Sequence, residues 1–175
     1  MDARQQRFLR LVEPHHAAAL AFARCLCRSQ ADGDDLFQTA LLRALEKIDH
    51  LREDGAFRAW FYRVIVSVHR NRARRPFWRR LVPLDDQGST PAFDDALAGD
   101  QRARLALASL PVEQRETIVL FEIEEWTIEE IAALHDVSIS AVKSRLVRAR
   151  DRLRQLYTKR LGAASRAVLA SGGTP

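Results

Sequence analysis

Cationic side chains crowd one stretch near the end of the chain. From Lys143 to Arg160 there are eight Lys or Arg residues and a single acid, Asp151. Ion pairing between residues four apart cannot neutralise so one-sided a run. Side chains of this type contact phosphates, and those that reach base edges in a groove supply sequence recognition. The alternatives for a basic helix are a solvated face and a site for an acidic partner.

The residues that position this run have the signals of a helix-turn-helix. Thr127 and Glu130 form a Thr-x-x-Glu capping box, and the apolar pattern after them predicts a short helix ending near Leu134. Asp136 falls where a tight turn between helices needs a left-handed backbone, which Asp tolerates better than most residues. Ser138 is a suitable N-cap for the next helix. The spacing therefore predicts two helices joined by a tight turn.

The second of these helices has one apolar and one cationic face. Apolar residues recur at alternating steps of four and three, which places them on one side: Val142, Leu146, Ala149, Leu153 and Leu156. Basic and polar residues take the other sides, with Lys143, Ser144 and Arg148 opposite and Arg145, Arg150, Arg152 and Arg154 on the flanks. A helix that packs on one side and is cationic on the other is suited to lie against DNA.

A second group of polar residues lies near position 35. One stripe of the predicted helix is apolar, with Phe37, Leu41, Leu45 and Ile48. The other faces carry Asp35, Gln38, Leu42 and Arg43. An exposed leucine beside polar groups indicates a surface for a protein partner. For Asp34 and Asp35 the alternative is local, because acids at a helix start are stabilised by the helix dipole.

Aromatic and basic residues are interleaved between positions 57 and 75. The simplest core face of this predicted helix contains Phe57, Phe61, Val64 and Val68. Another face carries Arg58, Tyr62, Val66 and His69, followed by Arg70, Asn71, Arg72, Arg74 and Arg75. Exposed bases stack on rings while cations follow phosphates, so the pattern suits single-stranded nucleic acid. The alternative is that Trp60 and Tyr62 complete a small helical core.

The composition predicts an all-α fold in two lobes. Among 175 residues only seven are Gly and six Pro, and no alternating strand pattern occurs. We expect a first helical domain over residues 1–80, a flexible linker rich in Pro, Gly, Ser, Thr and Asp over 81–99, a second domain over 100–161 and a frayed tail over 162–175. The net charge of +5 favours a polyanionic partner.

Metal binding and catalysis have little support in the sequence. Cys25 and Cys27 lie roughly 200° apart on a helix, so they cannot chelate one ion together, and His15 and His16 offer no further pattern. The chain contains no glycine-rich phosphate loop and no nucleophile constellation. We therefore expect no enzyme activity, cofactor or metal. The absence of a secretory signal and of long apolar runs predicts a cytoplasmic protein without membrane insertion.

Taken together, the two halves resemble a bacterial RNA polymerase sigma factor of the extracytoplasmic-function (ECF) type, in the sigma-70 family. The resemblance covers roughly residues 8–80 and 100–158. The sequence DLFQ at 35–38 is similar to the family's Asp-Leu-Val-Gln motif, and residues 54–63 are similar to its −10 loop and helix. The segment from Ile131 to Arg150, with Leu110-Pro111 before it, is similar to its −35 reader. This implies sigma region 2 and region 4 domains.

The resemblance also assigns roles to residues. It implies docking to core RNA polymerase, on the β′ clamp helices and on β, through Asp35, Gln38, Leu42 and Arg43. It implies contact with single-stranded −10 DNA through Arg58, Trp60, Tyr62, Arg63, His69, Arg70 and Asn71. It implies contact with the −35 duplex of promoter DNA through Ser140, Lys143, Ser144, Arg145, Arg148 and Arg150. Control by an anti-sigma factor is a further expectation.

Four positions depart from the family pattern, and two other functions are possible. Thr39 stands where the family usually has Glu, Ser67 replaces a common Asn, and His135-Asp136 replaces the usual Leu-Gly of the turn. A stand-alone helix-turn-helix transcription regulator is one rival, although the chain has no recognisable sensing domain. A sigma mimic that sequesters an anti-sigma factor is the other, but a mimic need not keep the arginines of both halves.

Overall fold

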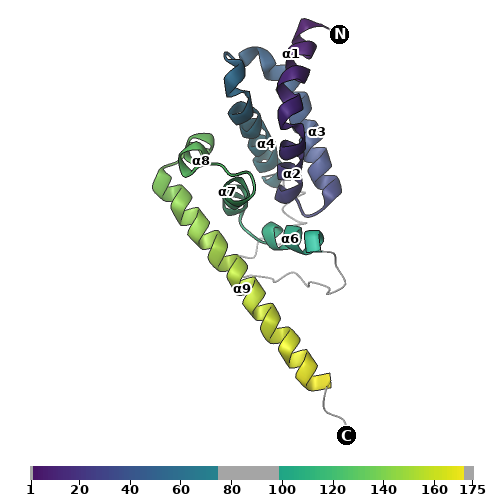
Figure 1. The fold of residues 1–175 in the computed structure, drawn as a ribbon, viewed down its shortest axis with the longest axis vertical. Helices are drawn as coiled ribbons and strands as arrows, with labels where there is room; N and C mark the ends of the chain where they lie inside the picture. The colour runs from purple at the N-terminus through teal and green to yellow at the C-terminus, as the bar shows by residue number, and fades with distance from the viewer. Residues whose placement is uncertain (1, 75–98, 172–175) are drawn as a thin grey trace.

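The computed structural model describes residues 2–74 and 99–171, without the side chains of residues 99, 100 and 159–171. Within these ranges every regular element is a helix. The helices form two groups (Figure 1), which we call the N-terminal lobe (residues 2–74) and the C-terminal lobe (residues 99–171). The all-α, two-lobed architecture predicted from the sequence is confirmed. None of the helices described is long and apolar enough to cross a membrane.

The N-terminal lobe is a helical bundle with short 3-10 turns between its helices. Its helices are α1 (Ala3–Val12), α2 (His16–Leu26), α3 (Gln30–Lys47) and α4 (Phe57–Ala73), and its 3-10 turns span Glu13–His15, Ile48–His50 and Asp54–Ala56. Helix α2 packs on α3, and α3 packs on α4. The amphipathic pattern of each helix therefore faces a common interior.

Aromatic rings fill the interior of this lobe. The Phe57 and Phe61 rings stack with their centroids 5.5 Å apart, and the Phe22 ring lies 5.0 Å from that of Tyr62. All four side chains are almost fully buried. Rings of this size bury large apolar areas and dominate the energy of a core. The prediction that Phe57 and Phe61 belong to the core is confirmed.

The C-terminal lobe consists of α6 (Gly99–Ala108), α7 (Val112–Glu122), α8 (Ile128–His135) and α9 (Ile139–Ser171). Helix α7 lies between the N-terminal lobe and α9 (Figure 1), and residues 114–120 are all buried. A helix that is buried on every side touches neighbours on every side. Here these neighbours are α2 and α4 of one lobe and α8 and α9 of the other.

The local signals of the helix-turn-helix act as the sequence predicted. The Thr127 Oγ1 atom accepts a hydrogen bond from the Glu130 amide (3.2 Å), and the Glu130 carboxylate accepts one from the Thr127 amide (2.8 Å). Asp136 has left-handed backbone angles of φ 55° and ψ 53°. The Ser138 Oγ atom accepts a hydrogen bond from the Ala141 amide at 3.2 Å. The capping box, the turn residue and the N-cap are confirmed.

One boundary differs from the sequence prediction. Helix α9 continues to Ser171, so residues 162–171, which we expected to be a frayed tail, are helical. Four of these ten residues are Ala, which has the highest helix propensity. Helix α7 begins directly after Pro111, which is its N-cap. The linker predicted over residues 81–99 lies, apart from its last residue in α6, outside the described residues.

Capping does not explain the acids near position 35. Helix α3 begins at Gln30, and its N-cap is Ser29, whose hydroxyl accepts from the Asp32 amide. Asp34 is therefore one turn inside the helix, where its carboxylate pairs with the Arg24 guanidinium at 2.6 Å. Asp34 joins α2 to α3, and the local alternative for Asp34 and Asp35 is wrong.

The backbones of α2 and α3 approach closely at Gly33. A Cβ atom on Gly33 would lie 2.5 Å from the Arg24 Cα atom. We predict that Gly33→Ala lowers the free energy of unfolding by about 1–3 kcal/mol, because the helices must separate. The gain in helix propensity, roughly 1 kcal/mol, offsets only part of this loss.

The matched control is Gly55→Ala, where a Cβ atom would meet no atom within 4 Å. Chemical denaturation of both variants measures the difference. Equal midpoints for Gly33→Ala and Gly55→Ala would contradict the close packing of α2 on α3.

Candidate nucleic-acid interface

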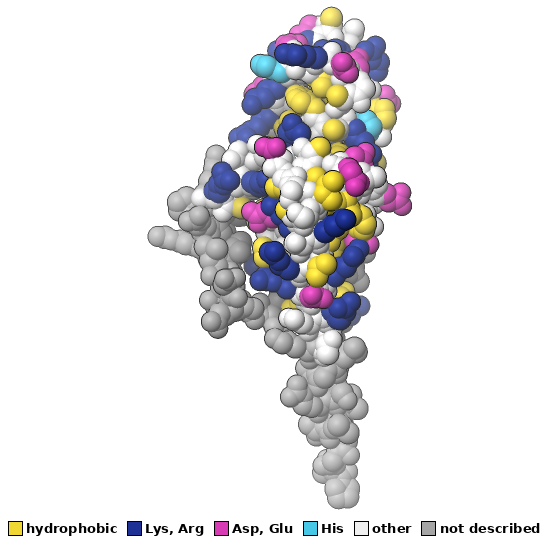
Figure 2. All heavy atoms as spheres, turned by 90° about the vertical axis from the view of Figure 1, so that its left-hand side faces the viewer, with side chains coloured by type: hydrophobic (Ala, Val, Ile, Leu, Met, Phe, Trp, Pro, Cys, Tyr) yellow, Lys and Arg dark blue, Asp and Glu magenta, His cyan; other side chains and the backbone are white. Residues whose placement is uncertain are grey.

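The first half of α9 presents an open face that is both polar and apolar. Of the residues predicted to contact −35 DNA, five are exposed: Ser140, Lys143, Ser144, Arg148 and Arg150. The opposite face is packed, since Val142, Leu146 and Ala149 are buried. Basic side chains are prominent on the face of the molecule shown in Figure 2. The predicted division of this helix into a core face and a basic face is confirmed.

Sequence reasoning missed two apolar residues on this open face. Val147 is 56% exposed and Ile139 is 43% exposed. Steps of four place Ile139, Lys143 and Val147 in one row along α9. Exposed methyl groups beside cations can contact the methyl group of thymine in a major groove. The sequence did indicate that these two residues are exposed, because neither belongs to the apolar repeat of the buried face.

Two arginines predicted for −35 DNA are partly engaged within the lobe. The Arg150 guanidinium pairs with the Glu122 carboxylate at 2.6 Å and lies 5.5 Å from the centre of the Phe121 ring. Arg145 is half-buried, with its guanidinium 3.4 Å from Nδ1 of His135. These contacts hold both side chains beside the recognition face, whereas Lys143 has no ion pair within the described part of the chain.

The surface predicted to dock a protein partner lies on α3. Asp35, Gln38 and Leu42 are exposed, Leu42 at 64%, and Arg43 is half-buried. The Asp35 carboxylate pairs with the Arg72 guanidinium of α4 at 2.7 Å. Exposed Leu42 among polar side chains fits the predicted partner surface, which we call the α3 surface (Asp35, Gln38, Leu42 and Arg43).

Thr39 has a defined role beside this surface. Its hydroxyl accepts a hydrogen bond from Arg72 at 2.7 Å and donates one to the backbone carbonyl of Asp35 at 2.8 Å. Thr39 therefore helps to fix Arg72 against α3. A shallow cavity of about 210 Å³ opens nearby between α3 and α4, and its lining brings Arg43 together with Trp60 and Arg63.

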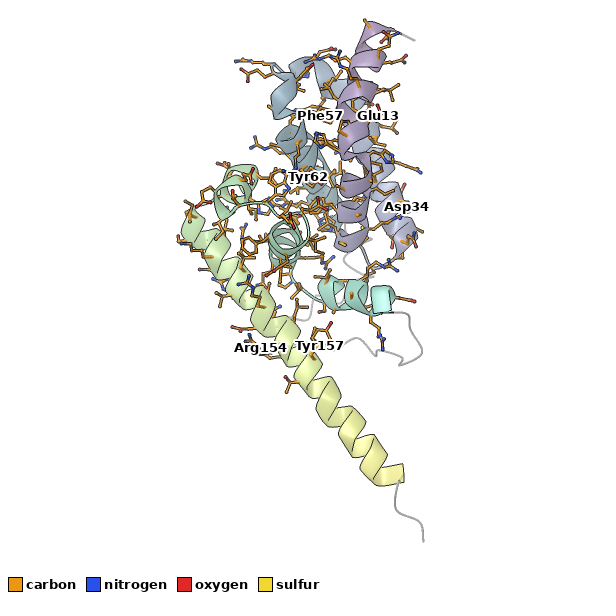
Figure 3. The ribbon with its side chains drawn as sticks, viewed as in Figure 1. Glu13, Asp34, Phe57, Tyr62, Arg154 and Tyr157 are labelled. Carbon is orange, nitrogen blue, oxygen red and sulfur yellow. The ribbon has the colours of Figure 1, made fainter. Side chains whose placement is uncertain are left out.

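Most of the residues predicted for −10 DNA contact the C-terminal lobe. Tyr62 lies in α4 where that helix meets α7 and α8 (Figure 3), and its hydroxyl donates to the Glu124 carboxylate. The Arg58 guanidinium lies 4.6 Å from the centre of the Trp126 ring and donates to the Glu124 carbonyl. Arg63 donates to the Ala133 carbonyl at 2.9 Å. Trp60, half-buried, and Asn71, exposed, remain outside these contacts.

The strongest of these contacts centre on Glu116 of α7. Its side chain has no exposed surface. One carboxylate oxygen lies 2.9 Å from His69 Nδ1, and the other accepts two hydrogen bonds from Arg70, at 2.9 and 2.7 Å. Burial raises the pKa of Glu116, but the hydrogen bonds and charges of His69 and Arg70 outweigh it, so the pKa is lowered overall. Glu116 is therefore ionised at neutral pH.

Arg115 makes the neighbouring connection between the lobes. Its buried guanidinium donates to the carbonyl of Leu26 at the end of α2, to that of Ala108 at the end of α6 and to that of Leu110 just after α6. Carbonyl groups at helix ends carry partial negative charge, which a cation stabilises. Burial lowers the pKa of Arg115 to about 10, so the group stays charged at neutral pH.

Sequence reasoning missed these residues of the C-terminal lobe. Arg115, Glu116, Glu124 and Trp126 have no motif of their own, and their partners in α2 and α4 are distant in sequence. A signal did exist, because Arg115 and Glu116 are adjacent charges at the start of an apolar helix. A pair of charges in a buried helix requires partners.

Comparison with known proteins identifies the two lobes. Residues 11–79 match the family model described as sigma-70 region 2, and residues 100–153 match that described as sigma-70, region 4. The ECF RNA polymerase sigma factor SigM of Mycobacterium tuberculosis is 33% identical over 153 residues, which cover 85% of this chain and 76% of SigM. The ECF RNA polymerase sigma-E factor of Escherichia coli K12 is 28% identical over 160 residues, 82% of each chain.

Solved structures agree with these matches. CnrH, in complex with the cytosolic domain of CnrY, superposes with a TM-score of 0.65 at 30% identity, covering 89% of this chain and 90% of CnrH. The sigma factor RpoE of Bartonella quintana, in complex with the anti-sigma factor NepR, gives 0.63 at 28% identity, covering 88% and 96%. The chain belongs to the ECF group of the sigma-70 family of RNA polymerase sigma factors.

The buried histidine His135 predicts acid sensitivity. Burial lowers its pKa from 6.5 to about 4. Above pH 6.5 the His135 side chain is neutral in both the folded and the unfolded protein, so its ionisation does not change the stability. Between pH 6.5 and 4 the unfolded chain binds a proton that the folded protein does not, so stability falls as the pH falls. A shift of this size removes up to about 3 kcal/mol by pH 4.

We therefore expect His135→Leu to unfold with a weaker pH dependence than the parent protein between pH 6.5 and 4. Denaturant melts of both proteins at several pH values measure this slope. Identical slopes would mean that His135 is solvated in the folded state.

Proposed function

We propose that the protein binds core RNA polymerase and directs promoter-specific initiation of transcription. The observation that carries this function is the presence, in one chain, of both sigma-70 domains with their two open surfaces. These surfaces are the α3 surface and the basic face of α9. A stand-alone regulator would use the second of these but has no need for the first.

The two domains divide the work. Arginines along α9 supply salt-dependent affinity for phosphates, while Lys143, Ser144 and Val147 read base edges of the −35 duplex in the major groove. The basic residues of α4 bind the −10 strand after the duplex opens. Unstacking a base costs a few kcal/mol, and polymerase contacts supply most of that energy. The α3 surface holds the protein on the β′ clamp helices, with further contact to β.

Regulation and location follow from the same family assignment. We infer control by an anti-sigma factor. Two similar structures support this inference, because RpoE is in complex with the anti-sigma factor NepR and CnrH is in complex with the cytosolic domain of CnrY. Polymerase and promoter are cytoplasmic, which places the protein in the cytoplasm. The protein performs no catalytic step of its own in this mechanism, and it needs no cofactor, because RNA synthesis belongs to the polymerase.

The α3 surface predicts which variants bind core polymerase more weakly. Asp35→Ala combined with Gln38→Ala, and Leu42→Ala alone, should each weaken binding to core polymerase at least tenfold, because both remove exposed side chains from the predicted contact. Loss of the exposed pair between Asp35 and Arg72 costs no more than about 1 kcal/mol of stability.

The matched control is Asp34→Ala, an acid on the same helix that pairs with Arg24 instead. Pull-down on core polymerase and transcription from a promoter library measure the effect, with circular dichroism to check folding. Normal initiation by the double variant would favour the stand-alone regulator.

The recognition face of α9 predicts three different responses. Lys143→Ala should weaken binding to the preferred −35 sequence by about 1–3 kcal/mol if its ammonium contacts a base edge. Arg148→Ala should do the same, or should weaken all sequences alike if it contacts phosphate only. Val147→Ala should reduce the preference for thymine at one position and leave the salt dependence unchanged, since no charge is lost.

Arg154→Ala is the control, because this exposed arginine pairs with Asp151 further along α9. Selection of −35 sequences from a randomised promoter library, with the holoenzyme formed by each variant, separates these outcomes. If Lys143→Ala and Val147→Ala selected the same sequences as the parent, the groove assignment would be wrong.

A further inference from the structure

Helix α1 carries a row of three arginines, Arg4, Arg7 and Arg10, spaced three residues apart. This spacing places their side chains on neighbouring turns of one side of the helix. Arg4 donates to the carbonyls of Leu45 and Glu46 in the last turn of α3, at 2.7 Å each. Arg7 and Arg10 reach further along the chain, to the loop that precedes α4. The row of arginines therefore follows the connection between α3 and α4.

The loop before α4, residues 51–56, is joined to α1 at two points. The Arg7 guanidinium donates to one oxygen of the Asp54 carboxylate, through Nε at 2.9 Å and Nη2 at 2.7 Å, and to the Leu51 carbonyl at 3.0 Å. Arg10 donates to the other carboxylate oxygen at 3.2 Å. The hydrogen bond from Arg7 is the main cause that lowers the pKa of Asp54, so this carboxylate is ionised at neutral pH.

The same side of the lobe also holds the first turn of α4. The Phe57 ring lies beside α1 (Figure 3), 6.2 Å from the ring of Phe8, and it stacks on the ring of His15 at 6.0 Å. The Trp60 ring, which is half-buried, packs on Phe57 at 5.8 Å. Residues 52–56 are all exposed. An accessible loop and an accessible aromatic ring are thus both fixed from the N-terminal part of the lobe.

We propose that Arg7 is a positioning residue for −10 recognition, which holds the loop of residues 51–56 in the conformation that meets the −10 strand. This inference rests on the proposed function, which assigns the −10 strand to this lobe. Arg7 acts through the loop, because its donors are directed to Asp54 and Leu51. A loop that is ordered before binding loses less freedom when the strand binds. A mobile loop can rearrange around several bases and discriminates less well between them.

Arg7→Ala removes all three of its hydrogen bonds to the loop. We expect this variant to discriminate about three- to tenfold less well between the preferred and the second-best −10 base, since one or two side chains must then be ordered on binding. Its −35 preference should stay parental, because α9 belongs to the other lobe. Asp54→Ala should have a similar effect, and the double variant should be little worse than either single variant, because the two residues act as one unit.

Arg4→Ala is the matched control. It removes the same charge from α1 and a similar set of hydrogen bonds, but from the end of α3 instead of the loop. Amide hydrogen exchange by NMR measures the order of the loop in the free protein. The Leu51 and Ala56 amides each donate to the carbonyl three residues earlier, at 3.0 and 3.1 Å, so an ordered loop protects them. Both should exchange about tenfold faster in Arg7→Ala than in Arg4→Ala.

Promoter libraries randomised at −10 with a fixed −35 element, and the reverse, measure specificity with the holoenzyme formed by each variant at two salt concentrations. A relaxed −10 preference and faster exchange in Arg7→Ala and Asp54→Ala, with neither change in Arg4→Ala, support the proposal. A parental −10 preference in Arg7→Ala, or equal relaxation in Arg4→Ala, overturns it. Uniformly weaker binding of all −10 sequences with a lower salt dependence also overturns it, because Arg7 would then contact a phosphate directly.

The two measurements separate this proposal from the proposed function. Failure of the parent protein to direct initiation by core polymerase would reject the proposed function. The exchange rates would still decide whether Arg7 holds the loop, because they are measured without polymerase or DNA. Parental exchange of the Leu51 and Ala56 amides in Arg7→Ala would reject that role.

Discussion

The arrangement of the two lobes depends on the burial of one carboxylate. Removing an ionised carboxylate from water costs several kcal/mol unless hydrogen-bond donors and an opposite charge replace the lost hydration. Glu116 finds those donors in His69 and Arg70, both on α4 of the other lobe. Apolar contacts between the lobes, such as that of Trp126 with Tyr62, stabilise their packing but are compatible with many relative orientations. The directional contacts to Glu116, with those of Arg115 to the end of α2, select one orientation.

The two basic surfaces of the protein are consequently in different states. The polar face of α9 is open, because its apolar side already packs on α7 and α8. The basic face of α4 is largely covered, because the C-terminal lobe supplies acids and carbonyl groups that match it. The face of α9 proposed to read the −35 duplex is therefore open, whereas the face of α4 proposed to bind the −10 strand is largely covered.

The features that the sequence predicted correctly are those that neighbouring residues determine. The capping box at Thr127, the left-handed turn at Asp136 and the two faces of α9 are each set by residues within a few positions. It did not predict how the lobes meet. Glu116 and Arg70 are 46 positions apart, and neither carries a pattern that names its partner. Tyr62 and His69 were interpreted as available to DNA because a periodic helix shows which residues share a face, not what covers that face.

The α3 surface is accessible in the same structure in which the basic face of α4 is largely covered. Asp35, Gln38 and Leu42 are exposed while the lobes are together, so a polymerase can dock on α3 without competing with the C-terminal lobe. Arg72 then connects the two regions, because it pairs with Asp35 from a position two residues after Arg70 on α4. The α3 surface is therefore exposed in the same structure in which the C-terminal lobe covers most of the basic residues of α4.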